Sequence, residues 1–145
     1  MKTLAFAFLA IFFTSQPSWQ TDFNRAQQEA KQSHKFILLN FSGSDWCAPC
    51  IKMKREVFEQ ETFIQYANDN LVLVRADFPR LKKNQLDANQ KAHNEKLAEQ
   101  YNSSGKFPLT LLLNEDGKVV KTWDGYSNES PQEFIKQIDQ SRNGK

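Results

Sequence analysis

The chain has 145 residues, the size of one domain with a substantial core. Apolar residues make up 39% and charged residues 25% of it, as in ordinary globular proteins. The net charge of +2 is too small, and its cations too evenly mixed with carboxylates, for a nucleic-acid-binding surface.

The first residues differ from the rest of the chain. Lys2 precedes an unbroken apolar run from Leu4 to Phe13, and small and polar residues follow. Ten residues of helix span about 15 Å, half of a bilayer core, so we expect no stable membrane span. The pattern is typical of a secretory signal peptide.

We therefore predict a signal peptide over residues 1–20, cleaved between Ser15 and Gln20, and a single domain over residues 21–145. Export would place this domain in the periplasm or outside the cell. A buried N-terminal helix or an uncleaved anchor is the alternative.

Hydrophobic periodicity and turn residues predict the elements of the domain in chain order. They are a helix over Asp22–Ser33, a strand over Phe36–Phe41, a helix over Ile51–Phe58, a short helix starting at a capping box at Thr62, a strand over Leu71–Asp77, a helix over Asn84–Tyr101, strands over Leu109–Leu113 and Val119–Trp123, and a helix capped by Ser130. This order predicts a mixed sheet covered by helices on both faces.

The stretch from Pro79 to Gln100 is the least typical part of the sequence, because it is rich in Lys, Asn and Gln. It fits either a long solvated helix or an element that recognises a partner.

The two cysteines of the chain, Cys47 and Cys50, are separated by two residues at the junction of a strand and a helix. Such a pair is typical of a redox site. Free N–H groups and the dipole at a helix N-terminus stabilise a thiolate, so we expect the pKa of Cys47 to lie below the usual value of about 8.5. Pro49 fits the first helical turn. We predict that Cys47 attacks and that Cys50, one turn on and more shielded, is the resolving thiol.

Other roles for the cysteines fit the sequence less well. A structural disulfide between them would close so small a loop that it constrains the unfolded chain only weakly. Tetrahedral zinc needs two more ligands, and His34 and His93 have no paired spacing with the cysteines. A Cys–His hydrolase needs an oriented base, and nothing marks His93 as one. We therefore expect no metal site.

Three landmarks follow one another along the chain: Trp46–Cys50 after a strand, Phe107-Pro108 before the strand Leu109–Leu113, and the turn Asp116–Lys118. Together they resemble the active-site signature, the cis-proline loop and the β-hairpin of the thioredoxin superfamily. The approach from Gly43 to Cys47 is similar to that of exported bacterial thioredoxin-like proteins. The resemblance implies an α/β thioredoxin fold: a central mixed sheet flanked by helices, with an extra N-terminal helix and an extended helix before the cis-proline strand.

The resemblance also implies a substrate groove, formed by Trp46, Ala48, Pro49, Phe107 and Pro108, with Gly125 on its opposite side. From the residues alone, Trp46 is either a core residue or a rim residue, and Pro108 is either an edge or turn proline or a cis-proline. The resemblance favours the rim and the cis bond, which would leave neighbouring backbone groups free to pair with a substrate chain.

Two positions depart from the family pattern. Asn40 stands where thioredoxins have a buried Asp that helps to deprotonate the resolving cysteine, and an amide cannot titrate. Asp45 could accept this proton instead, or it could cap the active-site helix. The Thr that often follows the cis-proline is Leu109, which predicts a more apolar groove.

The activity that the resemblance implies is thiol–disulfide exchange with protein thiols and disulfides. The Ala48-Pro49 pair is more similar to reducing thioredoxins than to strong oxidants, which favours a reductase or an isomerase. We expect a monomer that holds no cofactor and receives electrons from a partner dithiol. The alternative is a binding or chaperone-like module that uses the groove without turnover.

Overall fold

The computed structural model describes residues 17–144, so the apolar run of the predicted signal peptide lies outside the described residues. The elements are α1 (Phe23–Ser33), β1 (Phe36–Ser42), α2 (Ala48–Met53), the π-helical turn η1 (Lys54–Phe58), α3 (Glu61–Asn70), β2 (Leu71–Asp77), the 3₁₀ turn η2 (Lys82–Asn84), α4 (Ala88–Tyr101), β3 (Leu109–Leu113), β4 (Val119–Asp124) and α5 (Pro131–Asn143).

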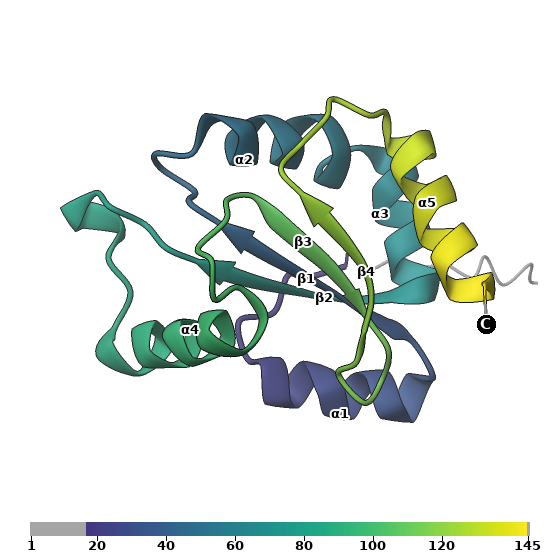
Figure 1. Ribbon diagram of the computed structural model, residues 1–145, viewed down its shortest axis with the longest axis horizontal. Helices are drawn as coiled ribbons and strands as arrows, with labels where there is room; N and C mark the ends of the chain where they lie inside the picture. Colours follow the sequence, from purple (N-terminus) through teal and green to yellow (C-terminus); the bar gives the residue numbers. More distant parts are fainter. Residues whose placement is uncertain (1–16, 145) are drawn as a thin grey trace, which may run out of the picture.

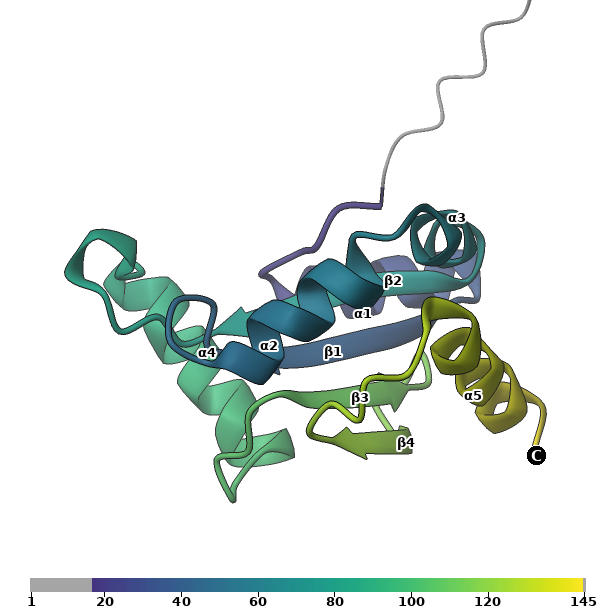
Figure 2. The same cartoon turned by 90° about the horizontal axis from the view of Figure 1, so that it is seen from above.

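The four strands form one mixed sheet in the order β2-β1-β3-β4. β1 and β2 are parallel, whereas β3 is antiparallel to both β1 and β4. Helices α2, α3 and α5 cover one face of the sheet, and α1 and α4 cover the other (Figures 1 and 2). The predicted α/β arrangement and the extra N-terminal helix are confirmed.

Alternate residues of β1 contribute to two separate hydrophobic cores. Ile37, Leu39 and Phe41 pack in the cluster that includes α1 and α4, while Leu38 packs in the cluster that includes α2, α3 and α5. Because successive side chains of a strand point to opposite faces, Asn40 of β1 lies on the α2 side of the sheet. The nearly continuous apolar run of β1 therefore reflects burial on both faces.

Two helix starts differ from the sequence prediction. The helix expected from Asn84 begins at Ala88, because Asp87 caps it by accepting a hydrogen bond from the backbone N–H of Gln90. The helix expected at Thr62 begins at Glu61, and its N-cap, Gln60, makes no side-chain cap bond. The helix was predicted correctly, but the capping box at Thr62 was wrong.

The last helix begins as predicted. Ser130 accepts a hydrogen bond from the backbone N–H of Glu133, and the Glu133 carboxylate accepts one from the backbone N–H of Ser130.

Residues just upstream of α1 also belong to the folded unit. Gln20 pairs with Val74 of β2 in a parallel bridge, and the Trp19 ring lies 4.9 Å from the ring of Phe58. Trp19 and Gln20 thus already contact the domain that the sequence analysis begins at residue 21.

Candidate active site

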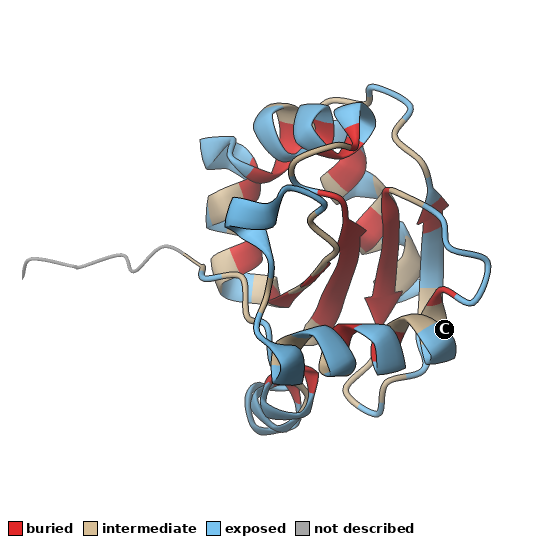
Figure 3. Ribbon diagram, turned by 90° about the vertical axis from the view of Figure 1, so that its left-hand side faces the viewer, coloured by how far each residue is buried: buried red, intermediate tan, exposed pale blue. Residues whose placement is uncertain are grey.

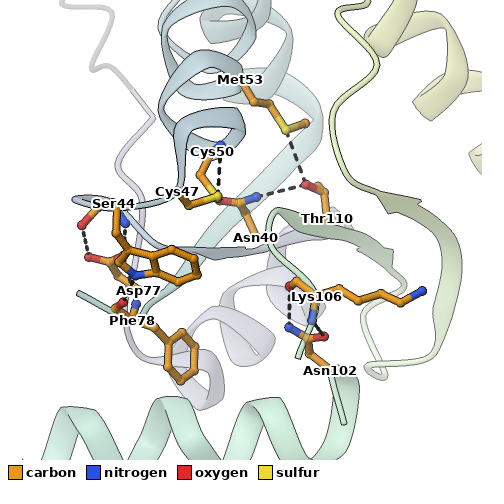
Figure 4. Close-up of a disulfide and its surroundings, with 11 residues drawn as sticks. Asn40, Ser44, Cys47, Cys50, Met53, Asp77, Phe78, Asn102, Lys106 and Thr110 are labelled. Carbon is orange, nitrogen blue, oxygen red and sulfur yellow. Dashed lines mark hydrogen bonds between the residues drawn. A yellow bond between two sulfur atoms is a disulfide. The ribbon is translucent and has the colours of Figure 1, made fainter. Parts of the chain in front are cut away.

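The cysteine pair lies where the chain passes from β1 to α2. Cys47 is the N-cap residue of α2, and its sulfur accepts a hydrogen bond of 3.3 Å from the backbone N–H of Cys50 (Figure 4). Pro49 occupies the first turn of this helix, as predicted. Cys47 and Cys50 form a disulfide. The sulfur of Cys47 therefore faces the N–H groups of a helix start.

Exposure does not distinguish the two cysteines in this oxidised form, because each is 4% exposed. Cys50 is thus not the more shielded of the two, contrary to the sequence prediction. Ala48 and Pro49 are exposed beside them, and Ile51, which the sequence analysis did not single out, is 44% exposed. These three residues form an apolar surface around the disulfide.

The Trp46 ring lies against the backbone before the disulfide. A Cβ atom on Gly43 would come within 2.3 Å of the Trp46 ring, so only glycine leaves room for the ring there. The indole N–H donates a hydrogen bond of 2.7 Å to the carbonyl of Phe78, and the ring meets Phe107 edge-on at 5.4 Å. Trp46 is half-buried, and it connects the loop that follows β2 to the loop that precedes β3.

Phe78 is a residue of this site that the sequence analysis missed. Its ring lies 5.5 Å from that of Phe107, and its backbone N–H donates to the carbonyl of Ser42. A usable signal was present: Phe78 directly follows the predicted strand Leu71–Asp77, and the carboxyl ends of parallel neighbouring strands meet at one edge.

The loop that carries Phe107 and Pro108 is held by one amide side chain. Asn102 donates to the carbonyl of Lys106 and accepts from its N–H, both at 2.9 Å. The Phe107–Pro108 peptide bond is cis, as the resemblance implied. The carbonyl of Pro108 accepts a hydrogen bond from the N–H of Gly125, so Gly125 lies directly beside the proline.

Beneath α2, Asn40 belongs to a buried polar chain. Its amide N–H donates to the hydroxyl of Thr110 at 3.0 Å, and that hydroxyl lies 3.9 Å from the sulfur of Met53 (Figure 4). Asn40 and Thr110 are 3% and 0% exposed. Neither an amide nor a hydroxyl is a base at neutral pH, so this chain orients groups under the helix without accepting a proton.

Asp45 does not cap the active-site helix, because the N-cap residue of α2 is Cys47. Its carboxylate accepts hydrogen bonds from the backbone N–H groups of Arg80 and Leu81 and from the side chain of Asn84. These donors, the Arg80 N–H first among them, hold the pKa of Asp45 below its usual value of 3.8. Asp45 therefore fixes the loop after β2, while the cap of α2 is Cys47.

A second carboxylate ties the same loop to the residues before the cysteines. Asp77 accepts hydrogen bonds from the N–H and the hydroxyl of Ser44, at 2.9 and 2.6 Å, and from the N–H of Phe78 (Figure 4).

A cavity of about 400 Å³ opens next to Trp46. Its lining includes Trp46, Phe78, Phe107, Arg80, Leu86 and Lys91. It lies on the α4 side of Trp46, between the loop after β2 and the loop before β3. Figure 3 looks at this end of the sheet, where exposed loops and helix faces surround buried strands.

The histidine considered as a catalytic base lies elsewhere. His93 is on α4, and its Nε2 accepts a hydrogen bond from the backbone N–H of Phe23 at the start of α1. Among residues 17–144, no three His, Cys, Asp or Glu side chains gather as metal ligands, and no helix is long and apolar enough to cross a membrane.

The sheet is of the thioredoxin type, the disulfide lies at the start of α2, and a cis-proline loop lies nearby. These three features together define a class of redox proteins. The family model of the thioredoxin-like domain matches residues 23–142, and the chain belongs to this family.

Two relatives come from Chlamydia pneumoniae. The disulfide bond reductase DsbH is 37% identical over 102 residues, 70% of this chain, and the thioredoxin-related protein DsbJ is 29% identical over 112 residues, 77% of this chain. The matched regions span 59% of DsbH and 31% of DsbJ. A solved structure of a DsbH oxidoreductase superposes with a TM-score of 0.79 at 26% identity, covering 97% of this chain and 94% of that one.

Proposed function

We propose that the chain is a thiol–disulfide oxidoreductase that acts on protein disulfides, as a reductase or an isomerase rather than an oxidant. The observation that carries the proposal is the position of the Cys47–Cys50 disulfide at the N-terminus of α2. In the reduced protein, the helix start and the Cys50 N–H would favour the thiolate of Cys47.

The reaction transfers two electrons to the substrate. The Cys47 thiolate attacks one sulfur of a substrate disulfide, forms a mixed disulfide and releases the other sulfur as a thiolate, which takes up a proton from water. Cys50 then attacks the Cys47 sulfur and releases the second substrate thiol, whose proton balances the one that Cys50 loses. The protein is left with the Cys47–Cys50 disulfide, and a partner dithiol reduces it again.

The surface around the disulfide supports a protein substrate. Among the predicted groove residues, Ala48 and Pro49 are exposed, Trp46 and Phe107 are half-buried, and Pro108 is buried. Ile51 extends the exposed apolar surface on the helix side. The reducing direction is supported by the relative called a disulfide bond reductase and by the Ala48-Pro49 pair between the cysteines.

We also propose that the chain works outside the cytoplasm, after the predicted leader is removed by cleavage upstream of Trp19, because Trp19 and Gln20 contact the folded domain. In the periplasm or after secretion, an electron-donating dithiol partner would have to keep Cys47 and Cys50 reduced.

Two serine variants test the roles of the cysteines. With Cys50→Ser, Cys47 should accumulate as a mixed disulfide with substrate proteins, because nothing resolves it. With Cys47→Ser, no such adduct should form. Adducts that form on Cys50 but not on Cys47 would reverse the assignment, and full cellular activity of the double variant would leave a binding module as the function.

Equilibration with a glutathione series, read by thiol alkylation, tests the direction of exchange. We expect a reduction potential near the thioredoxin value of about −270 mV or, for an isomerase, about −180 mV. A value of about −120 mV would make the protein an oxidant and overturn the proposed direction.

A further inference from the structure

The cavity beside Trp46 is bounded on one side by the segment Pro79–Lys91, called the 79–91 segment below. The 3₁₀ turn η2 of this segment projects beyond the carboxyl ends of β1 and β2 (Figure 1). Apolar walls come from Trp46, Phe78 and Phe107 on one side and from the half-buried Leu86 on the other. The cavity volume of about 400 Å³ falls in the range of sites that bind a compact group.

The 79–91 segment accounts for the net positive charge of the chain. It contains four cations and one carboxylate, a net charge of +3, whereas the whole chain has +2 and the remainder therefore sums to −1. The cations are Arg80, Lys82, Lys83 and Lys91. None of them forms an ion pair with any residue between 17 and 144.

The carboxylates of this region, including Asp77 in the lining of the cavity, accept hydrogen bonds from other groups. Asp45 and Asp77 accept hydrogen bonds from backbone N–H groups and from Asn84 and Ser44, and Asp87 caps α4. Arg80 lies over the Trp46 ring, with Cζ 3.6 Å from the ring centroid. The rim of the cavity thus presents Arg80 and Lys91, neither of which forms an ion pair within the described part of the chain.

We propose that this cavity binds a segment of the protein substrate in which a large apolar side chain stands next to an acidic residue, close to the cysteine that exchanges with Cys47. The apolar side chain lies between the aromatic walls and Leu86, and the acidic residue faces Arg80 and Lys91. Trp46 is both a wall of the cavity and the neighbour of Cys47, so a few extended residues, at about 3.3 Å each, span the two. The inference rests on the proposed oxidoreductase function and specifies which substrate sequence the cavity selects.

The test uses the reduced protein and three disulfides. Two are peptides that differ only beside the cysteine, one with Glu-Phe and the other with Lys-Ser, each in a mixed disulfide with glutathione. The third, 2-hydroxyethyl disulfide, is too small to reach the cavity. We expect kcat/KM for the Glu-Phe peptide to exceed that for the Lys-Ser peptide, and the difference to shrink as salt is added.

Lys91→Glu is the informative variant, with Lys96→Glu as its matched control. Both residues are exposed on α4, but Lys96 lines a different hollow, together with Phe23 and Tyr101. Lys91→Glu should lower kcat/KM for the Glu-Phe peptide about fivefold and leave 2-hydroxyethyl disulfide unchanged, since an exposed ion pair has about this effect. Lys96→Glu should change neither. Leu86→Ser should weaken the preference for phenylalanine without altering the response to salt.

The outcomes separate the two proposals. If the wild-type protein reduces none of the three disulfides, the oxidoreductase function is wrong. If it reduces both peptides equally well, or if Lys91→Glu and Lys96→Glu act alike, the function stands and the cavity does not select the substrate.

Discussion

Each of the two loops beside the cysteine pair forms hydrogen bonds with a polar side chain that helps to hold it, and these two side chains differ in kind. Asn102, which is 4% exposed, makes two hydrogen bonds to Lys106 and shapes the loop before Pro108. Asp45 lies on the surface and holds the loop after β2 through its carboxylate. The first loop depends on a buried neutral amide, and the second depends on a charge that acid can remove.

Trp46 joins these two loops, because its N–H binds the carbonyl of Phe78 and its ring contacts Phe107. The loop held by Asn102 is therefore the side of the candidate groove that does not respond to pH. The loop held by Asp45 is the side that a fall in pH can loosen. Four predictions test this difference.

The largest effect should come from Asn102→Ala. It removes the partners of the Lys106 N–H and carbonyl, so we expect a loss of about 2–3 kcal/mol in the free energy of unfolding in urea. Asn24→Ala, at an exposed position of α1, should change it by less than about 0.5 kcal/mol. Equal effects of the two variants would mean that Asn102 does not hold the loop.

Gly43→Ala should break the contacts by which Trp46 joins the two loops. The new Cβ would displace the Trp46 ring, at a loss of about 1–2 kcal/mol, since the Gly43 position leaves no space beside the ring. Displacement should shift the tryptophan fluorescence towards longer wavelength.

The same change in a Trp46→Phe background is the control, because Trp19 and Trp123 should not respond. A fluorescence shift that persists in this background would show that Trp46 is not its source.

Asp45→Asn should release the loop after β2 and leave the rest of the domain intact. The N–H groups of Arg80 and Leu81 bind different oxygens of Asp45. An amide accepts only through its oxygen and its nitrogen donates, so the two N–H groups cannot both keep their partners in this geometry. Trypsin should then cleave after Arg80, Lys82 and Lys83 several-fold faster, while the urea midpoint changes little. Unchanged cleavage would contradict the role given to Asp45.

The smallest effect is a dependence on pH. Because the pKa of Asp45 is lower in the folded state, its contribution to stability is complete above the usual value of 3.8 and is lost as the pH falls through the lowered pKa. The amide resonances of Arg80 and Leu81 should shift below that value in NMR spectra, whereas the Lys106 amide should not follow the same titration. A midpoint above 3.8 would contradict the assignment.

The sequence predicted best those features that depend on neighbouring residues or on a regular period. The strand Leu71–Asp77 matches β2 residue for residue, because its apolar residues fill both cores. The Ser130 cap of α5 was predicted for a similar reason, since both partners lie within three residues.

Features that depend on contacts between distant segments could not be predicted in this way. Asp45 binds Arg80, 35 residues away, and no local pattern distinguishes such a carboxylate from a helix cap. The close contact of Gly43 with the Trp46 ring likewise depends on the path of the chain after β1. The start of α4 at Ala88 was missed because Leu86 continues the helical spacing of apolar residues but lines the cavity instead.

The bridge between Gln20 and Val74 has a consequence for association between molecules. β2 is one of the two outer strands of the sheet, and the backbone of Gln20 occupies its free hydrogen-bonding groups at Leu73 and Arg75. An uncovered outer strand is a template on which another polypeptide can add. Trimming the chain beyond Gln20 would therefore leave a redox centre of the same geometry in a molecule more prone to self-association.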